Sequence, residues 1–350
     1  MCSAKVSGSL RFLAAYYVGQ SVTIHRAREL LKKAGYNPQS SDERTGPLSY
    51  QWVTLPSPAV TIGEHTSTGE VIATVYPFGV ISIEYRFEFK AVGLRELGSF
   101  SEKLYEDRTL DAEALERTTS VIKVIRPAVE KFELRAECED YWVFTLERVE
   151  PAMEIGSDWV REHRQILAMI LNSESEELAA QLGDAVVRDH LSYRKDELIV
   201  FNWNAAVMVS REVEGHIELI EFVNANLVAT RALGSRVRSS IDSSKRTLWE
   251  RLRLPQYGLA WLLAQHSRMF AVLDNPQELF GDDFRSLFYR KLMETLDIRG
   301  RRKSIGDRLE VSFHVFEAKT IILQGWLIIL LIVYEILAPW LYALFGVGTK

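Results

Sequence analysis

The 350-residue sequence predicts an α+β protein: a cytosolic mixed domain with β-hairpins and packed helices, then a long antiparallel helical hairpin that leads into a single C-terminal transmembrane helix. Three observations predict it. Alternating strands with hairpin turns fill the first part, helical 3-4 spacing follows Gly215, and an apolar run ends the chain. The expected parts are an α+β domain over 1–214, a helical hairpin over 215–320, a transmembrane helix over 321–346 and a short tail over 347–350.

Strands and helices alternate in the expected α+β domain. Leu10–Ile24 has the pattern of a strand with its turn, and Val22–Lys33 has a helical pattern. Ser99–Lys131 is a charged helical stretch, and a helix is expected to begin at Ser157 and Asp158. The other expected elements are strands over Tyr50–Leu55, Glu70–Tyr76, Val80–Phe89 and Phe132–Val149, a helix over Glu174–His190 and a hairpin over Glu197–Ser210.

The strand from Val80 shows how the sheet should lie. Ser82, Glu84 and Arg86 alternate with apolar and aromatic residues on the other side of the strand. Because side chains alternate between the two faces of a strand, this pattern predicts one buried face and one partly exposed face.

Two long helices are expected after Gly215. Apolar and small residues keep 3-4 spacing over 220–248, and the spacing returns over 298–323. Packing of these helices within one chain is the favoured use of the seam. Self-association of several chains is the alternative, because Arg302 and Lys319 at seam positions would be costly in a closed dry core but tolerable at an edge.

The run from Gly325 to Phe345 predicts a membrane span. Its 21 residues would extend roughly 30 Å as a helix, about the thickness of a hydrocarbon core. Trp326 lies at its start, and Trp340 and Tyr342 lie near its end, where aromatic rings favour the membrane interfaces. A buried core helix is the alternative.

Basic residues on the N-terminal side of this run predict its orientation. Arg299, Arg301, Arg302 and Lys303 precede it, whereas Lys350 is the one basic residue after it. The bulk of the chain is therefore expected in the cytosol, with the anchor in a bacterial inner membrane, or in the mitochondrial inner membrane as the alternative. The same four residues are candidates for lipid contact.

Glu335 is the ionisable residue within the apolar run. An intramembrane charge is by default a functional hypothesis. Contact within an oligomer is favoured over a proton or ion pathway, and Trp326, Trp340 and Tyr342 join Glu335 as candidates for membrane or oligomer contact.

Composition and motifs argue against several function classes. The net charge of −5 argues against sequence-independent nucleic-acid binding, and we expect no specific nucleic-acid partner. Phosphate-binding loops, nucleophile elbows and His-Glu-x-x-His motifs are absent from the sequence, so no catalytic, cofactor-binding or metal-binding residue is predicted. Cys2 and Cys138 are expected to be free thiols.

The chain resembles the family named for a factor required for meiotic nuclear division, a domain of unknown function. Residues 11–22 (RFLAAYYVGQSV), 75–83 (VYPFGVISI), 273–299 and 323–336 (LQGWLIILLIVYEI) are similar to its motifs, in the family's order. Two departures are Tyr85, where the family usually has Trp, and Gln324-Gly325 in place of its Glu. The resemblance implies a membrane-anchored protein; mitochondrial members oligomerise and support organellar translation by tethering.

The expected function is therefore a membrane-anchored, oligomeric scaffold or tether without catalytic activity. Its expected partners are the lipid bilayer, copies of itself and a protein that the sequence does not name, with the ribosome implied by the resemblance alone. A membrane-bound enzyme that acts on a small molecule through a pocket in the α+β domain is the alternative.

Overall fold

The computed structural model describes residues 4–40, 50–62, 65–150, 155–188, 190–194, 197–243 and 282–345. The chain divides into two compact units. The first consists of residues 1–232 and 269–301, and the second of residues 233–268 and 302–350.

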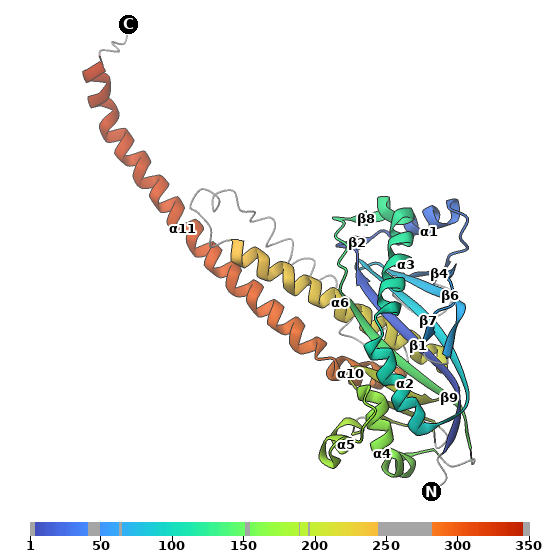
Figure 1. Cartoon of the computed structure of the whole chain (residues 1–350). Coiled ribbons are helices and arrows are strands. Elements are labelled where there is room, and N and C mark those ends of the chain that lie inside the picture. Colours follow the sequence, from blue (N-terminus) through green and yellow to red (C-terminus); the bar gives the residue numbers. More distant parts are fainter. Residues whose placement is uncertain are drawn as a thin grey trace. The chain divides into compact units, whose positions relative to one another are not determined.

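A large mixed sheet forms the centre of the first unit (Figure 1). Its strand order is β10-β11-β12-β9-β1-β7-β6-β4-β3, and β5 pairs with β6. Neighbouring described strands are antiparallel except for the parallel pair β12 and β9. A separate two-stranded sheet joins β2 and β8. The strands are β1 Lys5–Tyr17, β2 Ser21–Val22, β3 Gln39–Ser40, β4 Gln51–Pro56, β5 Thr61–Ile62, β6 His65–Tyr76, β7 Val80–Gly93, β8 Val129–Glu130, β9 Cys138–Glu150, β10 His190–Leu191, β11 Leu198–Phe201 and β12 Ala205–Val209.

Helices α1 to α4 cover one face of the sheet, where the main apolar core lies. Phe12 of β1 stands at its centre, with its ring centroid 4.4 Å from that of Trp142 and 6.3 Å from that of Tyr85. The helices of the chain are α1 Ile24–Lys33, α2 Leu94–Glu106, α3 Thr109–Ile125, the 3-10 turn η2 Arg126–Ala128, α4 Ser157–Asn172, α5 Ala180–Val186, α6 Val213–Ser243, α10 Asp283–Thr295 and α11 Ile298–Phe345.

Helices α6 and α10 cover the opposite face. The ring of Phe222 on α6 lies 6.0 Å from that of Tyr76 on β6 and 6.3 Å from that of Tyr289 on α10. This second layer makes the predicted exposure of the β7 face wrong, because Ser82 and Glu84 are buried. The central strands therefore carry buried side chains on both faces.

The predicted strands and the hairpin over Glu197–Ser210 are confirmed, except that the strand expected from Phe132 begins at Cys138. The helix expected over Glu174–His190 is wrong in extent, because only Ala180–Val186 is helical among its described residues.

The helical stretch expected earlier in the chain is divided. The charged stretch Ser99–Lys131 forms α2 and α3, separated where the Asp107 carboxylate accepts a hydrogen bond from the Thr109 amide at 2.7 Å. Helix α10 begins with a side-chain N-cap, since Asp282 accepts a hydrogen bond from the Phe284 amide. It ends at Thr295, and α11 follows after Asp297, whose φ is 50°.

The helical seam is buried where α11 begins. Ile298, Arg302, Ile305 and Leu309 are all buried, and in the second unit Ile305 lies against Gly234 of α6. The segment expected to connect the two long helices, residues 244–281, lies outside the described residues, so the helical hairpin stays a prediction.

The predicted transmembrane helix over 321–346 is corrected by the structure. Over the ranges that the structure describes, no helix combines the length and apolar character needed to cross a membrane. Glu335 lies among the exposed apolar side chains of α11 from Trp326 to Leu337. The prediction of a single-pass protein anchored in a bacterial or mitochondrial inner membrane is therefore wrong.

Gly79 allows the β6–β7 hairpin to pack against the end of β1. Its φ is +79°, and a Cβ there would lie 1.9 Å from the backbone oxygen of Gly19. We predict that Gly79→Ala lowers the free energy of unfolding by about 3 kcal/mol or more, because backbone strain and a backbone clash add. Chemical denaturation measures this change.

Gly35 provides the matched control. It also has a positive φ, but a Cβ there would have no atom within 4 Å. Gly35→Ala should cost only about 1–2 kcal/mol, the strain of the left-handed conformation alone. Equal losses for the two variants would contradict the clash at Gly79.

Candidate functional site: a buried charge cluster and an exposed apolar segment

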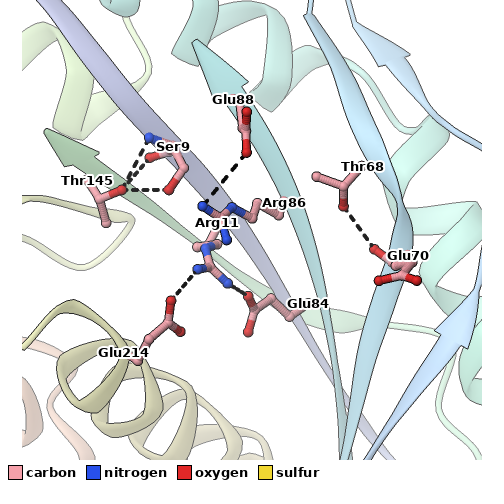
Figure 2. A network of polar contacts seen from close by, with 9 residues as sticks. All are labelled: Ser9, Arg11, Thr68, Glu70, Glu84, Arg86, Glu88, Thr145 and Glu214. Atoms are coloured by element: carbon pink, nitrogen blue, oxygen red, sulfur yellow. Dashed lines mark hydrogen bonds and ion pairs between the residues drawn. The ribbon is translucent and has the colours of Figure 1, made fainter. Parts of the chain in front are cut away.

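A charge cluster lies between the sheet and α6. We call Arg11 with Glu84 and Glu214 the Arg11 cluster. The Arg11 guanidinium donates through Nη1 to Glu84 on β7 and through Nη2 to Glu214 on α6, the latter at 2.6 Å (Figure 2). Glu84 pairs with Leu13 across β1 and β7, so Arg11, two residues before Leu13, is its diagonal neighbour on the same face.

The Arg11 cluster is closed toward the sheet and open at one edge. The Arg11 and Glu84 side chains are 5% and 8% exposed, whereas that of Glu214 is 65% exposed. Burial acts to lower the pKa of Arg11, but the two carboxylates together raise it, so the guanidinium stays charged. Burial also raises the pKa of Glu84, although Arg11 opposes this rise.

Polar contacts continue along the same strands. The Ser9 and Thr145 hydroxyls lie 2.7 Å apart and join β1 to β9, as Figure 2 shows. Thr145 also donates to the Ser9 carbonyl at 2.9 Å. These contacts satisfy buried polar atoms beside the Arg11 cluster.

The chemistry of the Arg11 cluster favours a structural role. Its members are two carboxylates and one guanidinium, without a nucleophile between them. Within the described residues, no group of three or more His, Cys, Asp or Glu side chains is placed to hold a metal ion. Cys138 is a free thiol, as predicted, and burial raises its pKa to about 12, which makes it a poor nucleophile at neutral pH. Cys2 lies outside the described residues.

The second candidate is a run of exposed apolar side chains on α11. We call Trp326–Leu337 the apolar segment. Its side chains other than Glu335 are large and apolar, and each is 43–64% exposed. Together they leave on the order of 1,000 Å² of apolar surface in solvent, more than the few hundred Å² typical of the largest patch on a soluble monomer.

The predicted contact residues fall in different environments. Trp326 and Glu335 belong to the apolar segment and are exposed. The side chains of Trp340 and Tyr342 lie outside the described residues. The four basic residues lie at the start of α11, more than twenty residues before the apolar segment. Arg299, Arg301 and Lys303 are exposed, whereas Arg302 is buried.

Two asparagines, Asn202 and Asn204, hold the turn of the β11–β12 hairpin through hydrogen bonds to the backbone. Asn202 accepts hydrogen bonds from the amides of Asn204 and Ala205 at 2.8 and 2.9 Å. Both asparagines also donate to the Leu171 carbonyl at the end of α4. The turn residues are thus structural, while Trp203 between them is 60% exposed.

Comparison with known proteins places the N-terminal part of the chain in a family. The family model described as "Uncharacterized protein MJ0711, N-terminal domain" matches residues 7–215, more than half of the chain. The chain belongs to this family. The matched region runs from β1 to the beginning of α6 and contains all three residues of the Arg11 cluster.

One curated relative extends the likeness beyond this family domain. The chain is 21% identical over 284 residues to "Uncharacterized protein MJ0711" from Methanocaldococcus jannaschii, an alignment that covers 77% of this chain and 81% of the relative. No solved structure matches. The expectation of a domain of unknown function is confirmed, whereas these comparisons do not support the resemblance to the family required for meiotic nuclear division.

Sequence reasoning missed the Arg11 cluster. A signal was present, because Arg11 interrupts an otherwise apolar run and Glu84 lies in an otherwise apolar strand. Two opposite charges in two apolar strands indicate a buried ion pair when the strands are neighbours. The order of strands in the sheet was the missing information.

We predict that Arg11→Met lowers the free energy of unfolding by about 3–5 kcal/mol, because it leaves Glu84 buried without its partner. The double variant Arg11→Met with Glu84→Leu should lower the free energy of unfolding clearly less, since it removes both charges of the buried pair. Denaturation of both variants measures the difference. A double variant at least as unstable as Arg11→Met would contradict the pairing.

Proposed function

We propose that this chain is a non-catalytic scaffold that assembles with copies of itself through the apolar segment of α11. The exposed apolar side chains from Trp326 to Leu337 carry this proposal. An exposed apolar patch of this size marks an interaction surface. The same segment supplies about as much area as one partner contributes to a standard interface, roughly 800 Å².

The distribution of the apolar side chains favours assemblies of three or more copies. Nine consecutive apolar residues from Trp326 to Tyr334 cover the whole circumference of the helix at about 100° per residue. One partner helix covers only one side. A bundle of several identical helices covers more of the circumference, and closed homo-oligomers are the commonest assemblies of soluble proteins.

The heptad register gives this bundle a seam. Continuing the spacing of the buried Ile305 and Leu309 along α11 leads to Trp326, Leu330, Val333 and Leu337. Glu335 lies two residues from Val333 and Leu337, on the opposite side of the helix. Its carboxylate therefore stays outside the seam, where water solvates it.

Members of the family required for meiotic nuclear division oligomerise and tether, but the comparisons do not support that resemblance, so the scaffold role rests on the apolar segment. A role in translation rests on that resemblance alone. The alternative, an enzyme with a pocket in the α+β domain, receives no support from the Arg11 cluster, because Arg11 and Glu84 are closed to solvent.

We predict that Leu330→Lys reduces self-association at least tenfold, because it places a charge in the seam. Ile328→Lys is the matched control: it adds the same charge two residues away, on the side of Glu335. Sedimentation equilibrium of the full chain in detergent-free buffer measures the assembly. The wild type and Ile328→Lys should have masses of three or more copies.

Three results would overturn this proposal. The first is a wild-type chain that stays monomeric at micromolar concentration. The second is equal assembly of Leu330→Lys and wild type. The third is a wild-type chain that leaves solution to float with lipid vesicles, while Leu330→Lys does not.

A further inference from the structure

Helix α6 brings another carboxylate to the buried face of the sheet. Glu214, Glu218 and Glu221 follow 4-3 spacing, so they share one side of α6. Glu214 reaches Arg11 from the exposed edge, whereas Glu221 is only 5% exposed. Glu221 lies close enough to Glu84 for the two carboxyl groups to influence each other.

Hydroxyl groups and carboxylates, not cations, act on the charge of Glu221. From β6, the Tyr76 and Thr74 hydroxyls are near enough to influence it. Its own Oε1 is buried and has no hydrogen-bond partner among the described residues. From β7 come Ser82 and Glu84. Glu218 adds a further negative charge from α6 itself.

The guanidinium of Arg11 already interacts with two other carboxylates. Both terminal nitrogens of Arg11, on β1, are taken, one by Glu84 and the other by Glu214. An ionised Glu221 would therefore place a second negative charge beside Glu84 without a cation of its own. Burial of an unpaired carboxylate is costly enough that such groups usually bind a proton instead.

We propose that Glu221 holds a proton in the folded protein at neutral pH, and that this buried proton is part of the contact between α6 and the sheet. The neutral carboxyl group removes the repulsion with Glu84. It also leaves Arg11 to balance Glu84 and Glu214. The proton is thus a ligand of the folded state, bound where two strands and one helix meet.

The electrostatics of the site agree with this geometry. Burial, and then the charge of Glu84, raise the pKa of Glu221 from 4.5 to about 8, and the Ser82 and Thr74 hydroxyls offset only part of the rise. Burial raises the pKa of Tyr76 well above its ordinary value, so its hydroxyl keeps its proton as well.

The sign of the pH dependence follows from linkage. Between about pH 5 and 8 the folded chain keeps the Glu221 proton and the unfolded chain does not, so folding takes up one proton. The unfolding equilibrium constant should therefore rise about tenfold for each pH unit in this window. Below the window both states hold the proton, and above it neither does, so the Glu221 contribution becomes independent of pH.

Glu221→Gln isolates this proton, because glutamine keeps the shape of the neutral carboxyl group. Comparing the unfolding constants of the full chain and this variant from pH 5 to 9 should show the tenfold-per-unit slope only in the wild type. Glu116→Gln, an exposed carboxylate on α3, is the matched control and should keep the wild-type slope. The infrared band of a protonated carboxyl group at pH 7 should disappear in Glu221→Gln alone.

Several outcomes would overturn the proposal. One is a Glu221→Gln variant with the wild-type pH slope, and another is the absence of a protonated carboxyl band in the wild type at pH 7. A third is stabilisation of the wild type by K⁺ or Ca²⁺ that Glu221→Gln abolishes, since a cation would then occupy the place of the proton. If Glu221→Gln fails to fold, the infrared band of the wild type still decides.

Discussion

The packing of α6 against the sheet is the contact on which the rest of the first unit depends. It buries the second face of β1, β6 and β7, which carries polar and charged side chains as well as apolar ones. Those charges are tolerable because Arg11 and Glu84 neutralise each other and because the proposed proton neutralises Glu221. The aromatic contacts of Phe222 supply the apolar part of the same interface.

This arrangement separates what holds the fold together from what is available to partners. The buried charges lie within or beside the family domain over residues 7–215, and the side chains of Arg11 and Glu84 are closed to solvent. The large apolar surface lies instead on α11, outside the matched residues. The proposed scaffold function therefore rests on α11, while the family domain supplies the folded body that an assembly would display.

Local sequence patterns predicted where the strands and helices lie better than they predicted which side chains are buried. Alternation located β4, β6, β7 and the β11–β12 hairpin, because a strand period is visible within a few residues. The same alternation at Glu84 predicted exposure, which is wrong, because a helix more than a hundred residues later covers that face. The apolar run at the end of the chain predicted a membrane span, because its length and hydropathy alone are those of one. The described part of α11 does not support that prediction.

Hydrogen exchange along α6 is the most direct test of this account. The amides of residues 216–230, which are buried except for the half-buried Glu218, should exchange as slowly as those of β1 on the other side of the charges. Protection of both segments at a level near global unfolding is the predicted result. Exchange of α6 that is orders of magnitude faster than that of β1 would contradict it, because the helix would then leave the sheet while the strands stay folded.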